Sequence, residues 1–166
     1  MKWVTRLYVH VDRTACPWLI RKFVDPQAEF IFVSPERIED VTKKEKAIPF
    51  DTQGAELGHH EEECSFDAII AKYKIMDPAV LELANIVRAA DTAKPGIAEE
   101  GSGLSAIMTG LSIMSPNDEE TVKKAAQVYE ALYDFCRLRL IQRESKDELE
   151  KMDRKTRREF LQKKMM

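Results

Sequence analysis

The segment Asp12-Arg13-Thr14-Ala15-Cys16-Pro17-Trp18 holds the first group of side chains in this sequence that could do chemistry. We expect it to join a strand to a helix that Thr14 caps. The unpaired N–H groups and dipole of a helix N-terminus attract anions, and Arg13 and Arg21 would add positive charge for an oxyanion beside Trp18. A thiol in the first helical turn has a lowered pKa, so Cys16 is a candidate catalytic thiolate. The alternative is that Cys16 and Trp18 are core residues and that Asp12 and Arg13 form a structural pair.

The second group is Glu56-Leu57-Gly58-His59-His60-Glu61-Glu62-Glu63-Cys64. Imidazole, carboxylate and thiolate side by side suit zinc, iron or manganese, although the spacing matches no standard metal motif. Neighbouring histidines usually point apart, so we expect His59 to face inward, with His60 and Cys64 as secondary metal candidates. For Glu61 to Glu63 we expect a solvated acidic loop.

The third feature is Asp91, which follows Arg88 at the predicted end of a helix. A carboxylate there is unfavourable with the helix dipole, so it needs a positive partner. That partner is either a metal ion or a salt bridge to Arg88 or Lys94. The metal hypothesis assigns Asp12, His59 and Asp91 to one divalent transition metal.

The elements that must position these residues run from strands early in the chain to helices late. We expect strands at 2–12, 29–33 and 48–51, and helices at 65–73, from Pro78 to about Asp91, at 104–114 and from Asn117 onward. The nearly continuous apolar run at 104–114 predicts a helix central in the core. The fold class is therefore α+β, with a small sheet from the N-terminal half packed against a mostly helical C-terminal half. We divide the chain into a domain over 1–142 and a basic tail, helical or disordered, over 143–166.

Composition narrows the function classes. The chain has 166 residues, 44% hydrophobic, and a net charge of -3, which gives no global reason to expect nucleic-acid binding. No apolar run suits a membrane helix or a secretory signal, and the three cysteines form no CxxC pair, so we expect a cytoplasmic protein without disulfides. Residues 151–166 carry a net charge of +5, but with few aromatic residues we favour a solvated helical extension over a nucleic-acid site. The long helix from Asn117 could pair with a second copy in a homodimer.

Several of these segments together resemble the chromate-resistance family, and most closely the C-terminal domain of its ChrB type. The similarity runs from about Trp3 to Arg137. It is carried by Val11 to Phe23, Phe50-Asp51, Glu56 to His59, Cys64-Ser65-Phe66-Asp67 and Ile86 to Asp91. The site candidates that match the family pattern are Asp12, Arg13, Cys16, Trp18, Arg21, His59, Cys64 and Asp91.

The resemblance implies a role with chromate-efflux operons, where ChrB-type proteins act as chromate-responsive regulators. DNA binding is usually ascribed to an additional N-terminal region of the longer relatives. This chain begins almost directly at the resistance domain, so we do not expect DNA binding from it alone.

Two hypotheses of different class follow. The first is a sensor or accessory resistance domain that binds a divalent metal, an oxyanion such as chromate, or both. The second is a small redox or hydrolytic enzyme in chromate detoxification that uses a bound metal or Cys16. DNA binding through the basic tail is a third hypothesis.

Overall fold

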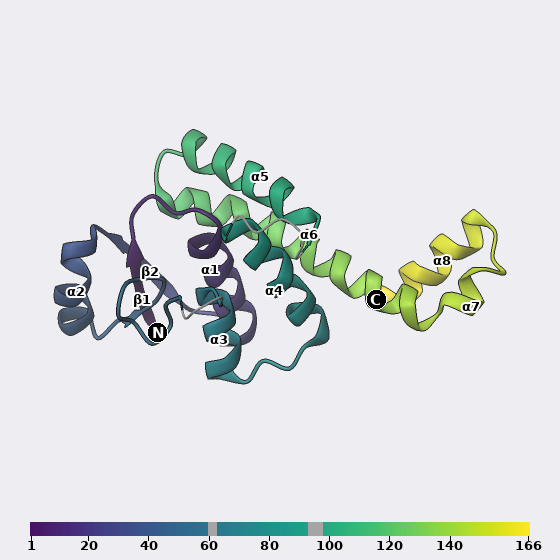
Figure 1. The fold of residues 1–166 in the computed structure, drawn as a ribbon, viewed down its shortest axis with the longest axis horizontal. Helices are drawn as coiled ribbons and strands as arrows, with labels where there is room; N and C mark the ends of the chain where they lie inside the picture. The colour runs from purple at the N-terminus through teal and green to yellow at the C-terminus, as the bar shows by residue number, and fades with distance from the viewer. Residues whose placement is uncertain (60–62, 93–97) are drawn as a thin grey trace.

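The computed structural model describes residues 1–59, 63–92 and 98–166 and has the predicted α+β fold (Figure 1). Its sheet contains β1 (Lys2–Arg6), β2 (Glu29–Val33) and β3 (Ile48–Pro49) in the order β2-β1-β3. Both pairings are parallel, with Trp3 beside Phe30 on one side and Ile48 on the other. The helix that follows β1 therefore crosses over the sheet to return the chain to β2.

Most of the chain is helical. The helical elements are α1 (Val11–Phe23), the 3-10 turn η1 (Pro35–Arg37), α2 (Ile38–Glu45), α3 (Ser65–Tyr73), α4 (Pro78–Asp91), α5 (Glu100–Met114), α6 (Asp118–Glu144), α7 (Lys146–Leu149) and α8 (Arg154–Met165). Side-chain oxygens cap two helices where the sequence predicts their starts: Asp77 accepts from the first N–H groups of α4, and Asn117 accepts from Glu120 in α6. In the described part of the chain, none of these helices combines the length and apolarity needed to cross a bilayer.

Successive residues of β1 face two different cores. Trp3 points into the main core, which α1, α3, α4 and α6 close, whereas Val4 packs with Ile38 and Val41 in a smaller core under α2. The sheet is thus a layer between α2 and the helical half, as Figure 1 shows. This alternation explains why the neighbouring residues Trp3 and Val4, which point to opposite faces of the sheet, are both fully buried.

The first strand is shorter than the sequence predicts. It ends at Arg6 rather than at Asp12, because Asp118 of α6 accepts the N–H groups of Tyr8 and Val9 and holds Tyr8 at a φ of 61°. The helix then begins at Val11, so Asp12 lies in its first turn. Thr14 is inside the helix, where its hydroxyl donates to the carbonyl oxygen of His10 or Val11 instead of capping the N-terminus.

The prediction that 104–114 forms a central core helix is wrong. On α5 only Gly101, Leu104 and Met108 are buried, while Ile113 and Met114 are 77% and 79% exposed. The helix packs along α4 by one narrow face, with Gly101 directly against Ala89. An apolar sequence therefore forms an outer layer of the bundle.

The basic tail over 143–166 is helical and lies beyond the helical bundle, at the far end of α6. In Figure 1, α6 continues past the bundle and ends in α7 and α8, which fold back along it. We call the segment from Ala131 to Met166 the C-terminal arm; its first turns still pack on the main core through Tyr133 and Cys136. Two arginines fasten α8 at its ends: Arg157 donates to the carbonyl oxygen of Leu149, and Arg137 of α6 donates to that of Met165.

Candidate functional site

The candidate side chains meet where β1 and β3 end. Both strands are parallel, so Arg6 at the end of β1 and Asp51 just after β3 lie at the same edge of the sheet. At β1 the chain order of the sheet reverses, with β2 on one side and β3 on the other. In parallel sheets such a switch point opens a crevice that commonly binds ligands.

Asp12 is a buried carboxylate at this edge, with 2% of its surface exposed. It accepts hydrogen bonds from the backbone N–H groups of Ser65 (2.6 Å) and Phe66 (3.3 Å), the first two residues of α3. The helix N-terminus that holds an anion is therefore that of α3 rather than that of α1, and the anion is a side chain of the protein itself. This contact locks α1 to α3 and fixes the direction of the carboxylate.

His59 stands between three carboxylates. Its Nε2 atom lies 3.2 Å from Asp12 Oδ2, 3.2 Å from Asp51 Oδ1 and 3.3 Å from Asp91 Oδ2. The hydrogen bond with Asp12 and the negative charges of Asp91 and Asp51 outweigh burial and raise the pKa of His59 to about 9. The side chain is still 45% exposed, so solvent reaches it.

Gly58 explains how the chain brings His59 to this point. A Cβ atom at residue 58 would lie 2.9 Å from the carbonyl oxygen of Thr52 and 3.1 Å from that of Ala55. The loop between β3 and His59 thus closes on itself with no room for a side chain. The Leu-Gly-His part of the second sequence group is therefore a turn that delivers the imidazole.

Asp91 completes the group from the C-terminal end of α4, as the sequence predicts. Burial, followed by the negative charge of Asp12, raises its pKa to about 6. One ligand atom each from Asp12, His59 and Asp91 lies within 4.8 Å of the others. Arg6 and Arg13 pair with Asp51. The imidazolium neutralises one of the two negative charges of Asp12 and Asp91, and a divalent cation in its place would offset both.

Asp51 belongs to a segment that carries the family resemblance, but the sequence did not indicate it as a site candidate. It accepts hydrogen bonds from Arg13 (2.9 Å), Arg6 (3.3 Å) and the Ser65 hydroxyl (3.2 Å), and it is buried. Arg13 is thus committed to Asp51 and to the carbonyl oxygen of Tyr8. The available signal was the position of Asp51 directly after an apolar extended segment, which places it at a strand end.

Two residues expected to bind an oxyanion lie elsewhere. The Trp18 indole donates to Glu130 of α6 and packs against Tyr133, so Trp18 is a core residue as the alternative interpretation held. Arg21 donates to the carbonyl oxygen of Ala28 and stacks over Phe30. Both assignments to the ligand site are corrected, because these side chains are on the part of α1 that faces α6 and β2 rather than on its first turn.

The expected reactive thiolate is also not formed. Cys16 is fully buried, and burial together with the charge of Asp12 raises its pKa well above the ordinary value, opposite to the predicted direction. Desolvation here outweighs the helix dipole. Cys64 is the N-cap residue before α3, with its sulfur 3.4 Å from Asp67, and burial likewise raises its pKa.

The sequence also offered Arg88 and Lys94 as partners of Asp91, and His60 as a further metal ligand. Arg88 forms a two-point ion pair with Asp67 (2.6 and 3.0 Å) rather than with Asp91. The alternative partner Lys94, the secondary metal candidate His60, and the glutamates at 61 and 62 lie outside the described residues.

A pocket connects the cluster with solvent. Arg6, Asp51 and His59 line it together with the loop over residues 52–56, and its volume is about 770 Å³. The side of the cluster that faces this pocket is the one that a small molecule can reach.

Comparison with known proteins identifies the family to which this chain is related. The sequence model described as "ChrB, C-terminal domain" matches residues 3–136. Protein ChrB of Cupriavidus metallidurans is 33% identical over 134 residues, which cover 80% of this chain and 40% of that relative. No solved structure has significant similarity to the chain. The resemblance seen in the sequence is confirmed, and the chain belongs to the ChrB C-terminal domain family of chromate-resistance proteins.

Proposed function

We propose that this chromate-resistance domain binds a divalent transition metal through Asp12, His59 and Asp91 and acts as a sensor or accessory resistance protein. The observation that carries the proposal is the convergence of these three ligand atoms within 4.8 Å, from α1, a loop and α4. Each ligand is held by the fold: α3 fixes Asp12, Gly58 fixes the turn before His59, and the end of α4 fixes Asp91.

The donor set restricts the metal. Two carboxylates and one imidazole suit manganese, iron or zinc, whereas soft ions require thiolates. The nearby thiols of Cys16 and Cys64 have raised pKa values and stay protonated near neutral pH. Three protein ligands also leave coordination positions open, and the pocket beside His59 supplies the space for a further ligand.

Charge suggests how an oxyanion such as chromate would enter. Without a metal, His59 is protonated near neutral pH because its pKa is raised to about 9. Arg6, Arg13 and this imidazolium then offset the three carboxylates of the cluster, and the balance of about 0 does not attract a dianion. A divalent cation bound by His59 displaces the imidazole proton and changes this balance to about +1. We therefore place the oxyanion at the open coordination positions, with Arg6 at the wall of the pocket.

Of the two enzymatic routes considered from the sequence, the thiolate route is disfavoured because Cys16 is buried and protonated. A metal-dependent redox or hydrolytic enzyme would use the same open coordination positions, and the solvent-accessible pocket favours this second candidate. Catalytic turnover of chromate by the metal-loaded protein would distinguish it from a sensor, which binds without turnover.

Metal content measured by mass spectrometry tests the proposed ligands. The protein is purified without chelator, loaded separately with Mn²⁺, Fe²⁺ or Zn²⁺ and dialysed. We expect about one ion per chain, and at least tenfold weaker binding in His59→Ala and Asp91→Asn, because each variant removes one ligand. His10→Ala and Asp40→Asn are matched controls, since His10 contacts Thr109 and Asp40 is exposed on α2. Unchanged metal binding in both ligand variants would refute the assignment.

Oxyanion binding is tested separately by calorimetry with chromate and with the redox-inert molybdate. The charge balance predicts tighter binding to the metal-loaded protein than to the chelated protein. Equal affinity in both states would contradict the metal-dependent arrangement and would leave the metal site itself intact.

A further inference from the structure

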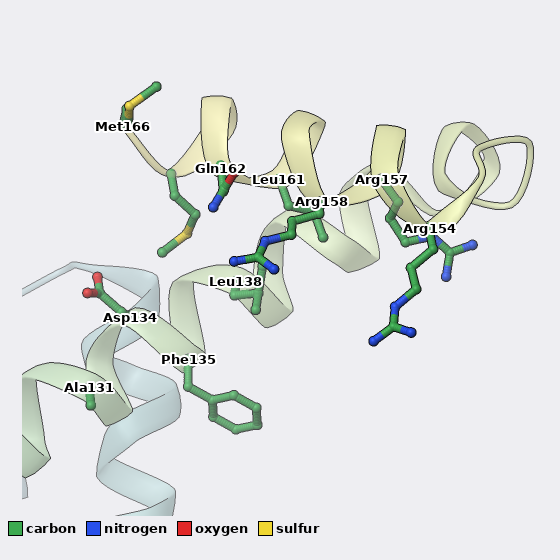
Figure 2. Close-up of a pocket in the computed structure, with 11 residues that line it drawn as sticks. Ala131, Asp134, Phe135, Leu138, Arg154, Arg157, Arg158, Leu161, Gln162 and Met166 are labelled. Carbon is green, nitrogen blue, oxygen red and sulfur yellow. The ribbon is translucent and has the colours of Figure 1, made fainter.

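The C-terminal arm contains an apolar groove that the proposed function does not use. It lies between α6 and α8 and has a volume of about 790 Å³ (Figure 2). Phe135 and Leu138 of α6 and Leu161 and Met165 of α8 line its apolar part, and Arg154 and Arg158 line it from the N-terminal half of α8. Most of the groove lies beyond residue 136, where the family match ends.

Helical periodicity produces both walls. Ala131, Phe135 and Leu138 recur at spacings of four and three along α6, so they share one face. On α8 the residues at 154, 158, 161 and 165 form the corresponding stripe. Arg157 and Arg137 fasten the two ends of α8, and no residue of α8 is fully buried. The groove is therefore an open feature between two helices whose separation is fixed at the ends.

The charges beside the groove are almost all positive. The twelve residues of α8 include six arginines and lysines, and its single acid, Glu159, faces Lys155 at 4.0 Å. Asp134, the acid that lines the groove, is paired with Arg137 at 3.0 Å. Within residues 1–59, 63–92 and 98–166, no ion-pair partner is found for Arg154 or Arg158. Unpaired guanidinium groups beside an apolar surface attract carboxylates that flank apolar side chains.

We propose that this groove binds an amphipathic helix of a partner protein, with apolar side chains at helical spacing and acidic residues along its flank. Such a helix inserts its apolar face between α6 and α8 and pairs its carboxylates with Arg154 and Arg158. A second copy of this chain is disfavoured, because groove-to-groove contact would bring two basic α8 helices together. A nucleic acid is disfavoured because the floor is mainly aliphatic and offers Phe135 as its one aromatic ring among the described lining residues.

The test uses the full chain and a synthetic peptide of about the length of α8, with leucines at positions i, i+3, i+4 and i+7 and glutamates on both flanks. Fluorescence anisotropy compares it with a scrambled peptide of the same composition and with a peptide that has lysines in place of the glutamates. The variants are Phe135→Ala for the floor and the double variant Arg154→Glu with Arg158→Glu for the rim. The control is Arg37→Glu with Lys44→Glu, two exposed positions on η1 and α2. Circular dichroism verifies that each variant is folded.

We expect saturable binding of the acidic amphipathic peptide, weakened about tenfold or more by each groove variant and unchanged in the control. The scrambled and lysine peptides should bind at least tenfold more weakly. No binding of the acidic peptide, or equal binding of its scrambled form, would overturn the proposal. So would sedimentation that shows a dimer lost in the rim variant, or duplex DNA that binds the same residues more tightly than the peptide.

Discussion

At the scale of single residues, Asp12 connects the fold with the candidate site. One carboxylate accepts two N–H groups of α3 and also faces His59. Neighbouring Arg13 reaches the other side of the cluster and holds Asp51. Asp12 and Arg13 are therefore not paired with each other, although such a pair was one interpretation of the sequence. Each binds a partner from a later part of the chain, which joins α1 to the loop after β3 and to α3.

The same cluster predicts how the chelated protein responds to pH. The folded state raises the pKa of Asp91 to about 6 and that of His59 to about 9. For both groups the folded protein binds protons more tightly than the unfolded chain. Their contribution to stability is therefore complete below the unfolded pKa and is lost as pH rises through the folded pKa. Thermal melts in the presence of chelator should show a falling Tm between about pH 6.5 and 9.

The control for this prediction is His59→Ala, in which the decline above about pH 6.5 should be shallower than in the native protein. Because His59 is partly exposed, we predict the direction of the change and not its size. A Tm that rises across this interval in the chelated native protein would show that His59 is not stabilised in its protonated form.

At the scale of elements, the sequence predicts the boundaries that local signals determine. The strand at 29–33 and the helix at 65–73 have the expected limits, and Asp77-Pro78 starts α4 as expected. Asp25-Pro26 follows the end of α1 at Phe23, in agreement with the restriction that proline imposes on the preceding residue. These signals lie within a few residues of the boundary that they set.

The sequence-based predictions are wrong or incomplete where residues far away in the chain determine the local structure. The end of β1 depends on Asp118, more than a hundred positions away, which accepts the N–H groups of Tyr8 and Val9. The role of Asp51 depends on the parallel pairing of β1 with the two residues of β3. Asp12, His59 and Asp91 were found because residue chemistry and family similarity singled them out, although their convergence is a property of the tertiary structure.

The contact between α4 and α5 gives a prediction at this scale. A Cβ atom added at Gly101 would lie 2.6 Å from Ala89 Cβ and 2.9 Å from its backbone carbon, whereas one at Gly103 meets nothing within 4 Å. Gly101→Ala should lower the free energy of unfolding by about 1–3 kcal/mol through overpacking. Gly103→Ala should raise it by up to about 1 kcal/mol through helix propensity. Denaturant titration measures both, and equal effects at the two positions would contradict the close approach of α4 and α5.

At the scale of the whole molecule, the candidate metal cluster and the groove lie in different regions. Asp12, His59 and Asp91 are inside the segment that matches the ChrB family, and they join α1, α4 and the loop after β3. Arg154 and Arg158 are outside that segment, on an arm that contacts the body through α6. The matched part spans 40% of the length of the relative Protein ChrB.

This arrangement predicts two separable responses in hydrogen exchange. Because α8 has no fully buried residue, its amides should exchange through local opening, faster than those of α1 and α4. A metal bound by Asp12, His59 and Asp91 stabilises every state in which α1 and α4 are docked, by about 2.7 kcal/mol at a free concentration of 100 times Kd. It should therefore slow exchange in α1, in α4 and at the N–H groups of Ser65 and Phe66, and leave α8 unchanged. The acidic peptide should instead protect α8. If metal protected α8 as strongly as α1, the arm and the body would unfold as one cooperative unit, and the two sites would be energetically coupled.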